Sequence, residues 1–229
     1  MFANNCRRLG WESLEGNWPV SILVAFLAAL LGGAAATFGV NLIWNLDDGL
    51  TQIIQIFPSH RFIYLVLTTY LSIFSPVTFI IGGTIQLGHC KFLLNQYDFK
   101  RAYVGDLFSQ FNQFGNGFCL QLLTGLFKAL WGLLFIIPGI IASYRYAMAP
   151  FIQAEHPEYT ATESITASKE LMYGHKFDLF CLELSFIGWA ILSIFTLGIG
   201  GLFLAPYTAA SRAAFYRQLC PAKNIIDAE

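Results

Sequence analysis

The segment from Phe177 to Leu219 reads FDLFCLELSFIGWAILSIFTLGIGGLFLAPYTAASRAAFYRQL and holds no charged residue between Glu183 and Arg212. Similar charge-free stretches lie between Glu15 and Asp47, between Arg61 and Lys91, and between Asp106 and Lys128. A bilayer hydrocarbon core about 30 Å thick takes roughly 20 helical residues. These stretches therefore predict helices that cross a membrane.

The composition points the same way. Of the 229 residues, 56% are hydrophobic and 12% are charged, about half the charged share of a soluble domain. The mean hydropathy is +0.57. Lys and Arg number 13 and Asp and Glu 14, which gives a net charge of -1. Without a basic stripe and interleaved aromatic residues, nucleic acid is excluded as a partner.

Two apolar regions are too long for one crossing. Residues 114–154 would reach about 60 Å as one helix, so they must fold back, and Pro138-Gly139 is the predicted turn. Residues 177–219 turn at Gly198 to Gly201. We therefore predict one all-α domain over 1–229, a polytopic integral membrane protein with six transmembrane helices. Their predicted ranges are about 20–44, 62–96, 114–137, 140–154, 177–196 and 200–219.

Every second predicted helix contains a proline. Pro76, Pro150 and Pro206 lie inside helices two, four and six, and an interior proline removes a backbone hydrogen bond and bends a helix. The alternation predicts three hairpins with kinks at these positions. The range 62–96 is either one kinked helix or a helix broken near Gly82-Gly83.

Lysines and arginines cluster on one side of this topology. They are Arg7, Arg8, Lys91, Lys100, Arg101, Lys169, Lys176, Arg212, Arg217 and Lys223, against Arg61 alone on the other side. By the positive-inside rule, both termini face the cytoplasm. All five cysteines then lie near the cytoplasmic side, where thiols stay reduced.

One short segment outside the predicted spans has clear helix signals. Thr160 and Glu163 have the spacing of a capping box, and Gly174 is a natural stop. A short cytoplasmic amphipathic helix is predicted near 160–173. It lies on the membrane surface or docks a partner protein, and the candidate docking residues are Glu163, Ile165, Ser168, Leu171 and Met172.

Three charged residues lie inside predicted spans: Lys128, Arg145 and Glu183. Charge in hydrocarbon is costly unless it is paired or wet, so these residues form a candidate intramembrane polar site. A Lys128–Glu183 ion pair is the preferred arrangement. Whether that pair is a structural staple or part of a polar pathway stays open.

No pattern indicates an active site. The histidines and cysteines lack ligand spacings such as HExxH or paired CxxC, and GxSxG, P-loop and GxGxxG patterns are absent. We predict no catalytic residues, no cofactor and no metal.

Several motifs together carry a family resemblance. They are LWGLLFIIPGII at 130–141, YAMAP at 146–150, SKELMYGHK at 168–176, LSFIGW at 184–189 and APY at 205–207. This set resembles the bacterial integral-membrane family catalogued as domain of unknown function 975. The resemblance implies a multi-helix protein of the bacterial inner or plasma membrane. The sequence is also distantly similar to the membrane domain attached to some glycerophosphodiester phosphodiesterases. The resemblance implies no particular activity.

Two functions fit these expectations. The first is a non-enzymatic component or accessory of a transport, secretion or envelope assembly, with the lipid bilayer and a membrane protein or a second copy as partners. The alternative is a small transporter or lipid-handling protein, with Lys128, Arg145 and Glu183 lining a polar cavity.

Overall fold

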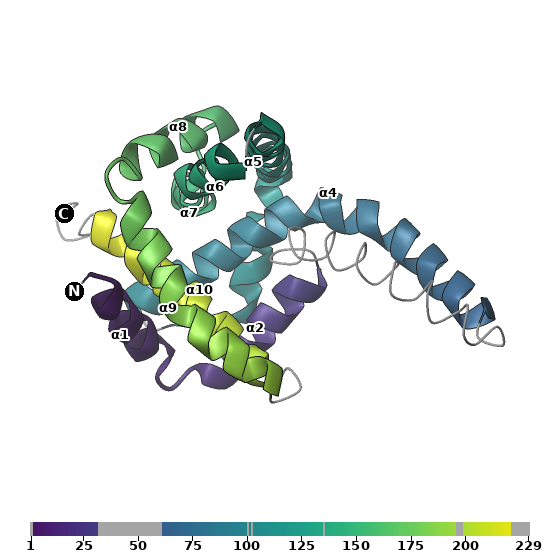
Figure 1. Cartoon of the computed structure of the whole chain (residues 1–229), viewed down its shortest axis with the longest axis horizontal. Coiled ribbons are helices and arrows are strands. Elements are labelled where there is room, and N and C mark those ends of the chain that lie inside the picture. The colour runs from purple at the N-terminus through teal and green to yellow at the C-terminus, as the bar shows by residue number, and fades with distance from the viewer. Residues whose placement is uncertain are drawn as a thin grey trace.

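The structure is a computed structural model that describes residues 2–31, 61–99, 101, 103–134, 136–195 and 199–220. Side chains are described at these positions except 30, 61–79, 133, 134, 136, 137, 194, 195 and 199. Within these ranges every regular element is a helix (Figure 1). In chain order they are α1 (Phe2–Leu14), α2 (Trp18–Leu30), α4 (Arg61–Phe99), the 3₁₀ helix η2 (Val104–Gln113), α5 (Phe114–Leu134), α6 (Ile136–Arg145), α7 (Ala149–Glu155), α8 (Ala161–Leu171), α9 (Lys176–Phe195) and α10 (Ile199–Leu219).

The six membrane spans predicted from the sequence are not found. Over the described residues, none of the helices combines the length and the apolar character that a membrane crossing requires. Among these helices α6 has 10 residues and α7 has 7, while α9 carries Lys176, Asp178 and Glu183. The charge-free stretches of the sequence do not show where these helices begin and end. The all-helical part of the prediction is confirmed for the described ranges.

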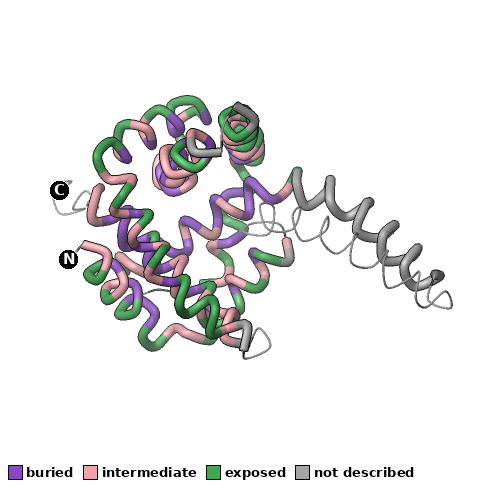
Figure 2. Tube along the Cα trace, in the orientation of Figure 1, coloured by how far each residue is buried: buried purple, intermediate pink, exposed green. Residues whose placement is uncertain are grey.

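The core forms around the second half of α4. Ile85 and Phe92 are fully buried there, together with Met148, Leu179 and Phe215 from α6–α7, α9 and α10. Figure 2 shows the buried residues concentrated along this part of α4 and the helices that cross it. α4 packs against η2, α5, α7 and α10.

Helix α4 distinguishes between the two alternatives for residues 62–96, a continuous helix and a helix broken near Gly82-Gly83. It is one helix of 39 residues that continues through position 76 and through Gly82-Gly83. At Gly88 a Cβ atom would stand against the carbonyl of Leu107, and at Gly83 it would stand against the carbonyl of Gly117. Glycine at these two positions therefore lets η2 and α5 lie directly on the α4 backbone.

The helix predicted over 140–154 is in fact two helices. Residues 146–148 form a turn between α6 and α7, and Pro150 lies in the first turn of α7 rather than in a helix interior. A proline there loses no hydrogen bond and suits the start of a helix. Likewise Pro138 lies inside α6, so it does not form the turn predicted at Pro138-Gly139. Pro206 lies within α10, as expected.

Some predictions fall outside the description. Residues 32–44 of the first predicted helix and residues 196–198, beside the predicted glycine turn, lie outside the described residues, and so does the side chain of Pro76.

The N-terminal helix α1 was not predicted, because Arg7, Arg8 and Glu12 interrupt its hydropathy. Its buried residues are nevertheless Cys6, Gly10, Ser13 and Leu14, which follow the i, i+4, i+7, i+8 pattern of an amphipathic helix. This face packs against α10, and the Cys6 thiol donates a hydrogen bond to Gln218 Oε1 over 3.2 Å.

The contact between α1 and α10 is closest at Gly10. A Cβ atom at Gly10 would approach the Ser211 backbone nitrogen and Cα to 2.8 Å. We predict that Gly10→Ala destabilises the protein by about 1–3 kcal/mol through overpacking. Gly188→Ala is the matched control, since a Cβ there meets nothing within 4 Å, and it should raise stability by up to about 1 kcal/mol. Thermal unfolding of both variants checks this, and equal effects would contradict the close approach.

Candidate functional site

The structure does not pair Lys128, Arg145 and Glu183 with one another as the predicted polar site. Glu183 instead pairs with Arg212, with 2.7 Å between Oε1 and the guanidinium nitrogen, and it accepts a hydrogen bond of 2.8 Å from the Tyr144 hydroxyl. Burial and the bond to Glu183 raise the pKa of Tyr144 to about 12. Glu183 thus links α6, α9 and α10.

Lys128 lies on α5 and forms none of the ion pairs among the described residues. Burial, followed by repulsion from Arg212, lowers the pKa of the Lys128 ammonium. Arg145 ends α6 and also has no carboxylate partner in the described ranges. The predicted Lys128–Glu183 pair is therefore replaced by Arg212–Glu183.

The capping box of α8 is present as predicted. The backbone N–H of Glu163 donates to Thr160 Oγ1 over 3.3 Å, and Thr160 N–H donates to Glu163 Oε2 over 2.7 Å. However, the apolar stripe of α8 is covered within the chain. Ile165, Ser168 and Met172 are buried, and Leu171 packs on the core.

Two polar contacts add to this packing of α8. The Ser168 hydroxyl donates to the Arg145 carbonyl over 2.8 Å, and the Ser164 hydroxyl donates to Gln153 Oε1 over 2.8 Å. Because α5 and α7 lie against α8, this stripe is not free to receive a partner.

An ion-pair cluster that the sequence did not suggest joins three helices. The Arg217 guanidinium on α10 contacts both carboxylate oxygens of Asp98 on α4, at 3.0 and 2.5 Å, and Glu155 on α7 at 2.6 Å. The Tyr216 hydroxyl also donates to Glu155, over 2.6 Å. Burial and this bond raise the pKa of Tyr216. The sequence alone predicts Arg217 only as a charge at the membrane surface.

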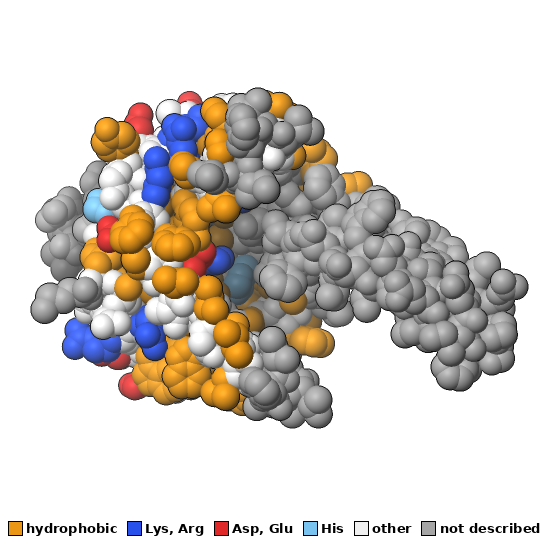
Figure 3. Space-filling model, in the orientation of Figure 1, with side chains coloured by type: hydrophobic (Ala, Val, Ile, Leu, Met, Phe, Trp, Pro, Cys, Tyr) orange, Lys and Arg blue, Asp and Glu red, His pale blue; other side chains and the backbone are white. Residues whose placement is uncertain are grey.

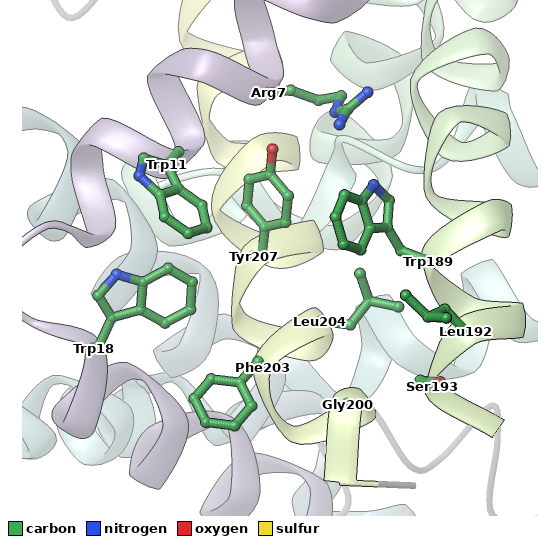
Figure 4. Close-up of a pocket in the computed structure, with 10 residues that line it drawn as sticks. All are labelled: Arg7, Trp11, Trp18, Trp189, Leu192, Ser193, Gly200, Phe203, Leu204 and Tyr207. Atoms are coloured by element: carbon green, nitrogen blue, oxygen red, sulfur yellow. The ribbon is translucent and has the colours of Figure 1, made fainter. Parts of the chain in front are cut away.

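A cleft of about 410 Å³ lies between α1, α2, α9 and α10. Its lining residues are Arg7, Trp11, Trp18, Trp189, Leu192, Ser193, Gly200, Phe203, Leu204 and Tyr207 (Figure 4). The rings contact one another: the Trp11 centroid lies 5.0 Å from Trp18 and 5.6 Å from Tyr207. We call this feature the aromatic cleft.

Arg7 closes one end of the aromatic cleft. Its guanidinium carbon lies 5.6 Å from the centroid of the Phe186 ring, which is a cation–π distance. Its Nε is buried without a hydrogen-bond partner. The sequence offered no sign of this site, because its residues come from 7–18 and 189–207 and meet only in the fold.

The far ends of α9 and α10 form an apolar surface beyond the Glu183–Arg212 pair. We define the apolar tip as residues 184–193 of α9 and 200–211 of α10, which contain no charged residue. Large side chains stand exposed on it: Leu184, Ile187, Trp189, Ile191, Leu192, Leu202 and Phe203, each between 48% and 55% exposed. Figure 3 shows hydrophobic side chains gathered toward the end where α9 finishes.

Metal ligands do not gather in the described part of the chain, where no three His, Cys, Asp or Glu residues are grouped to bind an ion. His156 contacts Glu158 at 2.9 Å and His175 contacts Asp178 at 3.2 Å. Each is a local pair within three residues of sequence, as expected for surface hydrogen bonding.

Comparison with known proteins finds a family whose model matches part of the chain. Residues 133–223 match the family described as "Protein of unknown function (DUF975)". The resemblance seen in the sequence is thereby confirmed over this range, which runs from the end of α5 through α10. Neither the curated proteins nor the solved structures contain a match.

Removing the Arg217 guanidinium tests the three-helix cluster. The Arg217 side chain is 7% exposed, and its partners Asp98 and Glu155 are 14% and 23% exposed. Arg217→Met should destabilise the protein by about 3–5 kcal/mol, because two largely buried carboxylates lose their counter-charge. Arg8→Met, at a side chain 70% exposed, should cost no more than about 1 kcal/mol. Urea unfolding compares the two, and similar midpoints would refute the cluster's role.

Removing the charge of Lys128 should stabilise the protein, in contrast to the loss expected for Arg217→Met. Its folded pKa lies below the ordinary 10.5, so the unfolded chain binds more protons just below that pH and the charged lysine opposes folding. Lys128→Met should therefore be more stable than the wild type at pH 7, with the difference shrinking as pH rises toward 10.5. Glu183→Gln should lose up to about 1 kcal/mol through its part-exposed pair with Arg212. Unfolding at pH 7 and pH 10 measures both, and matching losses at pH 7 would restore the Lys128–Glu183 pair.

Proposed function

We propose that this protein is a non-enzymatic component of a bacterial envelope, transport or secretion assembly, and that it contacts lipid at the cell membrane through the apolar tip. One observation carries the proposal. The charged side chains of the α9–α10 pair lie toward one end, and the other end carries large exposed apolar side chains with no charge among them.

Lipid is the occupant that this separation favours. Soluble proteins rarely expose contiguous apolar patches beyond a few hundred Å². A protein partner would bring a polar rim with paired charges, but the tip offers no charge over 22 residues of two neighbouring helices. The Glu183–Arg212 pair stands where the apolar surface begins, which suits the boundary between water and lipid.

Tryptophans near the tip support the same assignment. Trp11, Trp18 and Trp189 lie together around the aromatic cleft, next to the apolar side chains of α9 and α10. Tryptophan favours the interface between headgroups and acyl chains because its ring is apolar and its N–H can reach water.

The proposal assigns no chemistry to the polar clusters. Arg217, Asp98 and Glu155 bind one another across three helices, and Glu183 binds Arg212 and Tyr144. Groups that are engaged in this way join helices and are not presented to a substrate. A structural or accessory role fits such an arrangement.

Flotation with vesicles tests the lipid contact. Vesicles of phosphatidylethanolamine and phosphatidylglycerol should carry the wild-type protein upward in a density gradient. Ile187→Asp combined with Ile191→Asp should lower the floated fraction at least tenfold, since each change removes an exposed apolar side chain whose burial in lipid contributes about 1.5–3 kcal/mol, and introduces a charge.

The matched control is Tyr173→Asp, which alters a side chain 81% exposed in the turn that precedes the charged end of α9. Its flotation should equal that of the wild type. Failure of the wild type to float, or an equal loss in Tyr173→Asp, would refute lipid contact through the tip. Circular dichroism confirms that each variant remains helical.

A further inference from the structure

The aromatic cleft holds most of its polar groups toward one end, and the Ser193 hydroxyl near the other end donates to the Ala190 carbonyl. Figure 4 shows the Arg7 guanidinium, the Tyr207 hydroxyl and the Trp189 indole nitrogen toward one end, and Phe203, Leu204 and Leu192 toward the other. Its volume of about 410 Å³ lies in the lower part of the range found for small-molecule sites, about 300–1,000 Å³. A ligand that matches both ends carries a polar head on an apolar body.

The arginines of α1 and α10 indicate which charge the polar head of the ligand carries. The other arginines of α1 and α10 have carboxylate partners: Arg8 faces Glu12, Arg212 faces Glu183, and Arg217 faces Asp98 and Glu155. Arg7 has no such partner in the described part of the chain, and its buried Nε lacks an acceptor. The Arg7 guanidinium lines the cleft, and an anionic oxygen of a ligand would supply the counter-charge and a charge-assisted hydrogen bond.

The aromatic walls of the cleft indicate the chemistry of the ligand's apolar body. Trp11, Trp18 and Phe203 present ring faces and edges along the cleft, with centroids 5.0 Å apart for the two tryptophans and 6.4 Å apart for Trp18 and Phe203. An extended hydrocarbon chain buries apolar area along such a wall, and this burial supplies binding free energy in proportion to the area.

We propose that the aromatic cleft binds a single-chain amphiphile, with its anionic head paired to Arg7 and its acyl chain along the aromatic wall. The chemistry is shared by a fatty-acid carboxylate and a lysophospholipid phosphate. This inference goes beyond the lipid contact of the apolar tip, because it concerns one bound molecule with a stated orientation.

Quenching of tryptophan fluorescence tests the site. Bromine on an acyl chain quenches tryptophans that it touches, and three tryptophans line the cleft. The full chain is placed in phosphatidylcholine nanodiscs and titrated with dibromostearic acid or with its methyl ester. The free acid should quench at about tenfold lower concentration than the ester, because only the acid offers Arg7 a charge-assisted hydrogen bond.

Variants at neighbouring arginines locate the effect. Arg7→Gln should abolish the preference for the acid over the ester, Arg7→Lys should keep most of it, and Arg8→Gln should leave it unchanged. Equal quenching by acid and ester in the wild type would overturn the proposal, and so would an Arg8→Gln loss as large as that of Arg7→Gln.

A variant that blocks the aromatic cleft tests the binding site independently of fluorescence quenching. Leu192→Trp should fill the apolar end and lower retention of isotope-labelled palmitate at least tenfold. Leu184→Trp, on the same helix but outside the lining and 50% exposed, should retain it fully. Undiminished retention by Leu192→Trp would overturn the proposal.

Two further ligands separate the sources of the head group. Quenching by a brominated lysophospholipid at lower concentration than by the acid would assign the head as a phosphate and keep the site. Quenching by brominated phosphatidylglycerol without any by either single-chain ligand would overturn the single-chain assignment. Flotation is measured on the same variants, so loss of the cleft ligand is distinguishable from loss of vesicle binding.

Discussion

The described fold depends on the guanidinium of Arg217. It reaches Asp98 on α4 and Glu155 on α7 from α10, three helices that are far apart in sequence. Hydrophobic packing brings these helices together but allows them to slide, whereas two charge-assisted contacts from one planar group require a particular register. A buried arginine without these partners would be strongly unfavourable, so the arrangement of the central helices and this cluster are mutually dependent.

Sequence reasoning succeeded where the signal is local. The capping box of Thr160 and Glu163 specified α8, and the apolar runs located α4, α5, α9 and α10 to within a few residues. It failed where partners are distant: Arg217 and Asp98 are 119 residues apart, and nothing in either neighbourhood names the other. Lys128 and Glu183 were paired only because both interrupt apolar runs. Hydropathy also hid the break at 146–148, because turn and helix residues there are equally apolar.

The aromatic cleft combines two parts of the chain with different relationships to known proteins. Residues 133–223 match the family and supply Trp189, Phe203 and Tyr207. α1 and α2 lie outside that match and supply Arg7, Trp11 and Trp18. The apolar wall thus draws residues from both sides of the matched boundary, whereas its single cation comes from α1, so α1 determines what charge the cleft presents.

The contact between α1 and α10 affects the order of events during synthesis. Cys6 and Gln218 are 212 residues apart, so the apolar face of α1 emerges from the ribosome long before the helix that covers it. Contacts over such separations form late and slow the completion of folding. In the interval α1 exposes Leu14 and its neighbours to other surfaces, including chaperones. Helix α1 is therefore made long before α10 and reaches its final place only once α10 is available.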